Sequence, residues 1–180
     1  MDYRELGRTG VLVSPVCLGT AFRSQEDEDV CVQVIERAID KGCNFIDTAL
    51  YGEGRSEKVV GRALKGRRDE IVLTTKIFGT LGGGPNRGRL NRLNLMSGIE
   101  ASLQRLQTDY IDLYLLHSFD PHTPLDVTLR ALDDLVRQGK VRYIGCSNFA
   151  AWKIMEALWI SSEAGLASLV CTQSQYNLLN

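Results

Sequence analysis

Three of the side chains best suited to acid–base chemistry each end a short apolar run of the sequence. Asp47, Lys76 and His117 occupy these positions, and Tyr51 follows four residues after Asp47. A tyrosine hydroxyl has an ordinary pKa of about 10, and a nearby ammonium group such as that of Lys76 lowers this value by stabilising the phenolate. Asp47 would keep Lys76 protonated and oriented, and His117 would hydrogen-bond and polarise the reacting oxygen. The set favours delivery of a proton to an oxygen while another group attacks the carbon, as in the reduction of a carbonyl.

The apolar runs that carry these residues have the length of buried strands, and stretches of helical period separate them. This alternation predicts an α/β fold with parallel strands, whose carboxyl ends all point to the face on which active sites are built. Strands are expected to end at Thr20, Asp47, Lys76, His117, Cys146 and Gln173, after a short hairpin over 3–13. Residues far apart in the sequence would therefore converge on one pocket.

The helices between these strands are expected to begin at polar residues that accept hydrogen bonds from free backbone N–H groups. Ser24, Ser56 and Asn94 are the expected caps of the first three helices. In the fifth helix, Trp152 and Trp159 lie at helical spacing, and we expect both to pack in the core.

The number of strands sets the expected architecture. Five βα units and a sixth strand are expected in a single domain over 1–180, with no linker or low-complexity segment. A closed (β/α)8 TIM barrel needs eight units, typically about 250 residues. The chain is therefore expected to be an incomplete (β/α)8 barrel with an N-terminal β-hairpin, or else a different six-stranded α/β fold. Its end, without a tail or cap after the sixth strand, favours a C-terminally truncated fragment.

The composition is that of an ordinary globular domain. The 180 residues are 44% hydrophobic and 24% charged, with a formal net charge of −1, which gives no basic surface for nucleic acid or an anionic membrane. No apolar run approaches the roughly 18 residues of a membrane span. The five cysteines lack a C-x-x-C pair and the charged N-terminus lacks a signal-peptide core, so a reduced, cytoplasmic protein is expected.

Metal and phosphate sites are not expected. The only histidines, His117 and His122, are separated by Pro121, which disfavours the helical spacing of a metal pair. The long loop over 78–92 contains a glycine run over 82–84, but no Gly-Lys-Ser/Thr follows, so a phosphate loop is not predicted.

Several motifs resemble those of the aldo-keto reductases, over essentially the whole chain. They are Arg4–Gly10 (RELGRTG) with Gly19-Thr20, Asn44–Gly52 (NFIDTALYG), Thr74–Lys76 (TTK), Leu115–His117 (LLH), Gly139–Phe149 (GKVRYIGCSNF) and Gln173–Asn177 (QSQYN). Members of that family are (β/α)8 barrels whose N-terminal hairpin closes the bottom, and they reduce aldehydes and ketones with a nicotinamide cofactor, usually NADPH. The local sequence is similar to the bacterial aryl-alcohol dehydrogenase-like and channel β-subunit-like branches, which leaves the substrate open.

The resemblance also implies roles for single residues. Tyr51 would be the general acid, Lys76 and Asp47 the pair that tunes it, and His117 the group that orients and polarises the carbonyl. The residues implied in cofactor binding are Gly19 and Thr20 near the ribose, Ser147, Asn148 and Gln173 at the nicotinamide carboxamide, and Asp47.

The length of the chain departs from the family pattern. The missing units would hold the late strands that stack on the nicotinamide and grip the adenosine 2′-phosphate, so the chain alone is expected to bind NADPH weakly or not at all, and to be inactive alone. One alternative is a non-catalytic cofactor-sensing or partner-binding module. Another is a Schiff-base aldolase that uses Lys76, which is less favoured because Asp47 would keep Lys76 charged. The substrate, the choice between NADPH and NADH and the oligomeric state stay open.

Overall fold

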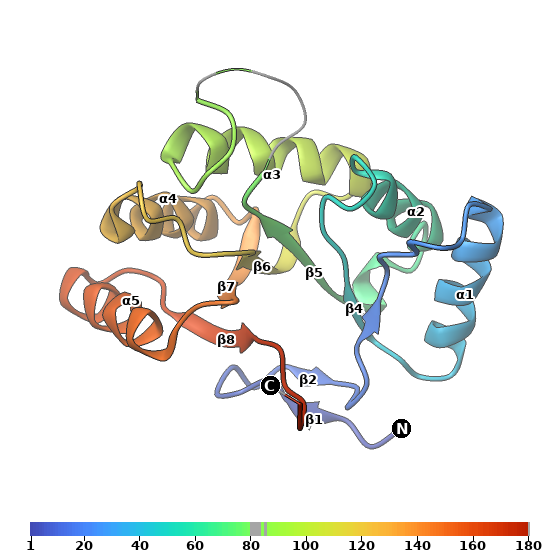
Figure 1. Cartoon of the computed structure of the whole chain (residues 1–180). Coiled ribbons are helices and arrows are strands. Elements are labelled where there is room, and N and C mark those ends of the chain that lie inside the picture. Colours follow the sequence, from blue (N-terminus) through green and yellow to red (C-terminus); the bar gives the residue numbers. More distant parts are fainter. Residues whose placement is uncertain (80–83, 85, 180) are drawn as a thin grey trace.

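The computed structural model describes residues 1–79, 84 and 86–179 (Figure 1). Its centre is a six-stranded sheet in the order β3-β4-β5-β6-β7-β8, in which all neighbours are parallel. The strands are β3 (Leu18–Gly19), β4 (Phe45–Asp47), β5 (Val72–Ile77), β6 (Ile111–Leu116), β7 (Val141–Ser147) and β8 (Leu169–Gln173). The spatial order follows the chain order, so the predicted parallel sheet is confirmed.

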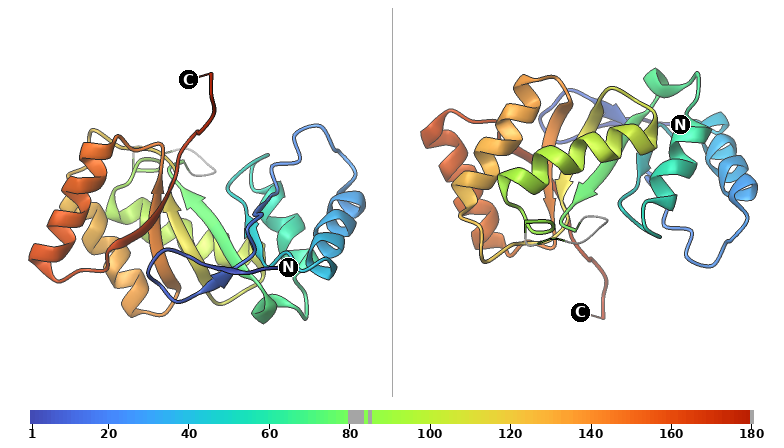
Figure 2. Two further views of the ribbon diagram at one scale, coloured as in Figure 1. Left: turned by 90° about the horizontal axis from the view of Figure 1, so that it is seen from below. Right: turned by 90° about the horizontal axis from the view of Figure 1, so that it is seen from above.

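One helix connects each strand of the sheet to the next, on the outer face of the sheet (Figure 2). The helices are α1 (Glu28–Asp40), α2 (Arg55–Ala63), α3 (Arg92–Leu106), α4 (Leu125–Arg137) and α5 (Ala151–Ala164), with a short 3-10 helix (Arg68–Glu70) after α2. The sheet curls into a half-barrel, and β3 and β8 are not paired with each other in the described part of the chain. The architecture is thus an incomplete (β/α)8 barrel.

The N-terminal hairpin lies at the amino ends of the strands. It consists of β1 (Arg4–Glu5) and β2 (Leu12–Val13), which pair antiparallel. Asn44, which precedes β4, holds the hairpin through both atoms of its amide. Its Oδ1 accepts from the N–H of Ser14 at 2.7 Å, and its Nδ2 donates to the carbonyl of Leu12 at 2.9 Å. The opposite face, at the carboxyl ends of the strands, stays clear of the hairpin.

Alternate residues of the strands face two different environments. Ile46, Leu73 and Ile144 belong to the core cluster that the strands form with the helices, and each is at most 1% exposed. Residues at the alternate positions of β4, β5 and β6 line a cavity of about 160 Å³ on the inner face, together with Leu6 of the hairpin; these are Phe45, Asp47, Thr74, Leu113 and Leu115. Burial of the outer face fixes the register of each strand. The register then determines to which face of the sheet each residue at the ends of β4, β5 and β6 points.

Two helices begin at caps other than those the sequence predicted. Asp27 caps α1, since its carboxylate accepts from the N–H groups of Asp29 and Val30, and Ser24 does not. Asn91 caps α3 by accepting from the N–H of Asn94 at 3.0 Å. Asp27 lies three positions closer to α1 than Ser24, and Asn91 lies three positions before Asn94, which is already inside α3. In both helices the residue directly before the first turn has the side chain that reaches the free N–H groups.

The prediction for α2 also needs correction. The helix begins after Gly54, which has a φ of 87° and no side-chain hydrogen bond to the helix. Ser56, the predicted cap, lies inside the first turn and is buried. Its hydroxyl points to the strand ends instead, because unsatisfied polar groups there need a buried partner.

The predicted core packing of Trp152 and Trp159 is wrong. Each is 65% exposed, and Met155 on the same helix is 63% exposed. The buried residues of α5 are the small ones, Ala157 and Ser161. The helix carries apolar residues on both sides, so helical spacing identified a stripe without telling which stripe meets the sheet.

Part of the loop over 78–92 lies outside the described residues, and so does most of the glycine run over 82–84. Within the described ranges, no helix is long and apolar enough to cross a membrane. The same ranges contain no group of three or more His, Cys, Asp or Glu side chains placed to hold a metal ion.

Candidate active site

Three adjacent strands place predicted residues together on the inner face of the half-barrel. Asp47 is the last residue of β4, and Lys76 is the residue before the end of β5. His117 follows β6 directly, and its N–H donates to the carbonyl of Ile77 at 2.9 Å. The parallel arrangement thus brings together side chains that lie up to 70 positions apart in the sequence.

Tyr51 reaches the same face from the turn between β4 and α2. Its N–H donates to the carbonyl of Ala49 at 2.7 Å, and its own carbonyl accepts from the N–H of Gly54 at 3.2 Å. The Tyr51 ring lies edge-on to the His117 ring, with centroids 6.0 Å apart and an interplanar angle of 84°. The Lys76 ammonium lies 5.8 Å from the Tyr51 ring centroid. All four residues predicted to act together therefore lie in one site.

The charges of Asp47 and Lys76 form a buried ion pair. The Lys76 Nζ lies 2.5 Å from Oδ1 of Asp47 and also donates to the carbonyl of Thr48 at 3.0 Å. The side chain of Lys76 is only 1% exposed, and that of Asp47 is 12% exposed. A buried ammonium needs a charged partner and hydrogen bonds, and Asp47 and the Thr48 carbonyl supply both and hold the Lys76 side chain in one orientation.

The pKa of Tyr51 is raised in this structure, whereas the sequence predicted that Lys76 would lower it. Burial is the main cause, the negative charge of Asp47 adds to it, and the positive charge of Arg23 opposes it. Tyr51 therefore keeps its proton at neutral pH, as a proton donor must.

His117 has the opposite shift. Burial and the nearby Lys76 charge lower its pKa, and Asp47 partly opposes them. A lowered pKa leaves the imidazole neutral near pH 7, with one nitrogen that donates and one that accepts a hydrogen bond. His117 can thus hydrogen-bond an oxygen beside Tyr51 without competing as a second acid.

The residues implied in cofactor binding at β7 and β8 also come together. Ser147 Oγ donates to the carbonyl of Gln173 at 2.8 Å, and Asn148 Nδ2 donates to the carbonyl of His117 at 3.0 Å. Asn148 has a φ of 58°, a left-handed conformation that asparagine tolerates better than most residues. The Asn148 amide and the Ser147 hydroxyl near His117 fit a ligand that both donates and accepts hydrogen bonds, as a carboxamide does.

At the other edge of the sheet, Gly19 and Thr20 differ from each other. Gly19, at the end of β3, is exposed, so its backbone is open to a ligand. Thr20 is buried, and its hydroxyl donates to the carbonyl of Asp47 at 2.9 Å. The side chain of Thr20 therefore supports the end of β4 in this structure.

Sequence reasoning missed a buried charged residue next to the site. Glu57 of α2 is fully buried and accepts from Thr75 Oγ1 at 2.6 Å and from Arg105 Nε at 2.6 Å. It joins α2 to β5 and α3 directly behind Lys76. Its signal in the sequence was weak, because a glutamate in the first turn of a helix is equally typical of a solvated position.

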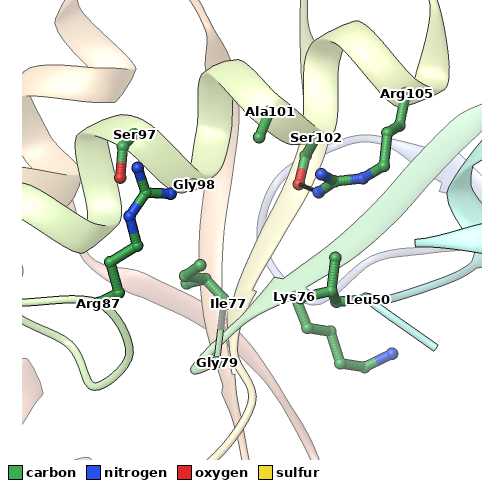
Figure 3. Close-up of a pocket in the computed structure, with 10 residues that line it drawn as sticks. All are labelled: Leu50, Lys76, Ile77, Gly79, Arg87, Ser97, Gly98, Ala101, Ser102 and Arg105. Atoms are coloured by element: carbon green, nitrogen blue, oxygen red, sulfur yellow. Dashed lines mark hydrogen bonds between the residues drawn. The ribbon is translucent and has the colours of Figure 1, made fainter. Parts of the chain in front are cut away.

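A small cavity of about 50 Å³ lies between the end of β5 and α3, on the helix side of the sheet (Figure 3). Arg105 and Ser102 of α3 line it, while the Lys76 ammonium points away from that helix. A cavity of this size holds water at most, since one water occupies about 30 Å³ of the liquid. The chemistry of Lys76 belongs to the inner face.

The sequence of residues 15–180 matches the Aldo/keto reductase family over nearly the whole chain. The chain belongs to the aldo/keto reductase family. An uncharacterized oxidoreductase of Bacillus subtilis (strain 168), YrpG, is 41% identical over 192 residues, which cover 99% of this chain and 59% of that protein. A probable voltage-gated potassium channel subunit beta of Oryza sativa subsp. japonica is 34% identical over 186 residues, which cover 100% of this chain and 56% of that protein.

This aldo/keto reductase chain therefore spans less than two thirds of the length of these two relatives. The shorter length agrees with the incomplete barrel, since the described strands leave β3 and β8 unjoined.

Proposed function

We propose that this chain provides the catalytic strand ends of an NADP(H)-dependent oxidoreductase that reduces aldehydes or ketones to alcohols, with Tyr51 as general acid. The observation that carries the proposal is the placement of Tyr51 beside His117 and beside the buried Lys76–Asp47 pair. An oxidoreductase among the relatives supports the reaction class.

The chain's own residues would handle the oxygen of the substrate. A bound nicotinamide cofactor would supply the hydride for the carbonyl carbon. The neutral imidazole of His117 would donate a hydrogen bond to the carbonyl oxygen and orient it toward Tyr51. The Tyr51 hydroxyl would then transfer its proton to that oxygen, and the phenolate that remains would lie beside the Lys76–Asp47 pair. Asp47 would keep Lys76 charged and in place throughout.

The test compares the wild type with Tyr51→Phe, which removes the hydroxyl and keeps the ring. The protein, extended past Asn180 wherever its reading frame continues, is mixed with NADPH and 4-nitrobenzaldehyde, and the loss of NADPH absorbance is measured. We expect Tyr51→Phe to lower kcat by about 10²–10⁴-fold, the usual contribution of general acid catalysis. If the wild type fails to oxidise NADPH with every aldehyde and ketone tested, the reductase proposal fails.

We further propose that the isolated 180-residue chain binds NADPH weakly or not at all. In support, Ser147, Asn148 and Gln173 lie at β7 and β8, beside the open edge of the half-barrel. Isothermal titration calorimetry of the isolated chain with NADPH tests this, and a micromolar or tighter Kd would contradict it.

A second candidate function is a partner-binding module that keeps the same site. The exposed apolar side chains of Trp152, Met155 and Trp159 on α5 favour it, as does the channel subunit among the relatives. NADPH binding without turnover in the extended protein would favour this candidate. A Schiff-base aldolase is disfavoured, because the ion pair with Asp47 keeps Lys76 protonated and so not nucleophilic.

A further inference from the structure

Three buried hydroxyl groups meet beneath the catalytic residues. Thr20 follows β3, Thr48 follows β4, and Ser56 lies in the first turn of α2, and all three are buried. Ser56 Oγ lies at the centre of the group. It is 2.6 Å from the carbonyl oxygen of Thr20, 2.7 Å from Oγ1 of Thr48 and 3.0 Å from Oγ1 of Thr20.

The number of protons fixes the direction of these hydrogen bonds. Each hydroxyl has one proton to donate, and the contact of Ser56 with the Thr20 carbonyl requires the proton of Ser56. The Thr20 hydroxyl lies 2.9 Å from the Asp47 carbonyl, which also can only accept. Thr48 therefore donates to Ser56, because its other contact, with the carbonyl of Ala49, is long at 3.5 Å. The Ser56 hydroxyl therefore accepts from the Thr48 hydroxyl and donates to the Thr20 carbonyl, so it links the two segments that follow β3 and β4.

The atoms that this cluster holds are those that position the catalytic charges. The carbonyl of Thr48 accepts from Lys76 Nζ at 3.0 Å, and the side chain of the preceding residue, Asp47, forms the ion pair. The N–H of Ser56 also donates to the carbonyl of Tyr51 at 3.3 Å. Ser56 thus contacts both the segment that binds Lys76 and the turn that carries Tyr51.

The hydroxyl of Ser56 does not serve its own helix. The side chains of Asp27 and Asn91 cap α1 and α3, whereas α2 begins at Gly54 without a side-chain cap. Ser56 is the second residue of α2, beyond the N-cap position at which a serine side chain would accept from a free backbone N–H. In α2 it is directed at the strand ends instead.

We propose that Ser56 is a positioning residue that fixes Lys76 and Tyr51 relative to each other. The catalytic meaning of this role rests on the proposed reductase function. Without the Ser56 hydroxyl, the buried carbonyl of Thr20 loses its donor from α2, and the hydroxyl of Thr48 keeps only its long contact with the carbonyl of Ala49. The segment 47–51 is then held less firmly, and the Lys76 ammonium becomes more accessible to water.

The test uses Ser56→Ala and a matched control, Ser161→Ala. Ser161 is also a buried helical serine, but its Oγ has no hydrogen-bond partner among the described residues. Both changes remove one buried hydroxyl, and only the first removes the hydroxyl of the cluster. Ser56→Thr, which keeps a hydroxyl, serves as the rescue variant.

The first measurement needs neither cofactor nor turnover. Heteronuclear NMR of isotopically labelled lysine follows the hydrogen exchange of the Lys76 ammonium, with its signal assigned through Lys76→Met. We expect Ser56→Ala to accelerate this exchange about tenfold or more, because a local opening around a lost hydrogen bond exposes the group. Ser161→Ala is expected to leave it unchanged, and Ser56→Thr to restore part of the wild-type rate.

The second measurement is turnover of the extended protein with NADPH and 4-nitrobenzaldehyde. We expect Ser56→Ala to lower kcat about 10–100-fold with KM nearly unchanged, because a displacement of about 1 Å can cost 10²-fold. A lower melting temperature with unchanged exchange and unchanged kcat would mean a purely structural role and would overturn the proposal. So would equal effects of Ser56→Ala and Ser161→Ala. If the wild type reduces no carbonyl compound, the proposed function fails, and the Lys76 exchange alone decides whether Ser56 positions that residue.

Discussion

The region of β4, α2, β5 and α3 buries charged side chains, whereas the region of β8 and α5 exposes apolar ones. In the first, the charged pairs Lys76–Asp47 and Arg105–Glu57 are withdrawn from water and hydrogen-bonded. In the second, Trp152 and Trp159 expose most of their apolar surface. The difference teaches that the buried pair and Tyr51 can be organised within two adjacent βα units, to which the next strand, β6, adds His117. The residues proposed to bind the cofactor, at β7 and β8, lie at the edge of the sheet where β8 has no further strand partner among the described residues.

The largest expected effect comes from removing the carboxylate of Glu57, which tests whether the first region depends on its buried charged pairs. Glu57→Ala leaves Arg105, whose side chain is 15% exposed, without its partner. We expect a loss of about 3–5 kcal/mol in the free energy of unfolding, because an unpaired charge stays buried. Urea denaturation measures this loss. The control, Glu100→Ala, breaks the exposed pair with Lys140 and should cost about 1 kcal/mol or less. Equal costs for the two variants would show that the region gains nothing from burial of its charges.

A second, smaller effect is a pH dependence of stability that comes from His117. Its pKa is lowered in the folded protein, so the unfolded chain, whose histidine titrates at about 6.5, takes up the proton first as the pH falls. The folded state therefore loses stability as the pH falls through about 6.5 toward the lowered folded pKa. His117→Asn removes this contribution. We expect the free energy of unfolding of that variant to fall less steeply between about pH 7 and pH 5, and an identical slope would contradict the burial of the imidazole.

The smallest expected effect concerns the exposed side of α5. Trp159→Lys replaces an indole that is 65% exposed, and we expect the free energy of unfolding of the isolated chain to change by about 0.5 kcal/mol or less. Leu132→Ala in α4, where the side chain is fully buried, should cost about 2–5 kcal/mol. A large loss from Trp159→Lys, measured by the same urea denaturation, would mean that this face is covered in solution.

The sequence alone predicted the parallel strands and the grouping of Tyr51 with the three charged or ionisable strand-end residues. The strands stand out in the sequence because each is a short, mostly apolar run between stretches of helical period. It did not predict the direction of the Tyr51 pKa shift, since that depends on burial and on Asp47 as well as on Lys76. Nor did it identify the roles of Ser56 and Glu57, because the residue type alone does not tell whether a serine or a glutamate is buried or solvated. What decides between them is the partner, such as Thr48 or Arg105, which lies on another element.

Both tryptophans of the chain stand on the outer side of α5, and this has an optical consequence. The intrinsic emission of the protein reports on that one surface, whatever occurs at the strand ends near Tyr51. A soluble quencher should reach both indoles, and a segment or partner that settles on α5 should shield them and shift the emission to shorter wavelength. The chain thus carries a fluorescent label for coverage of its open side, placed apart from its proposed chemistry.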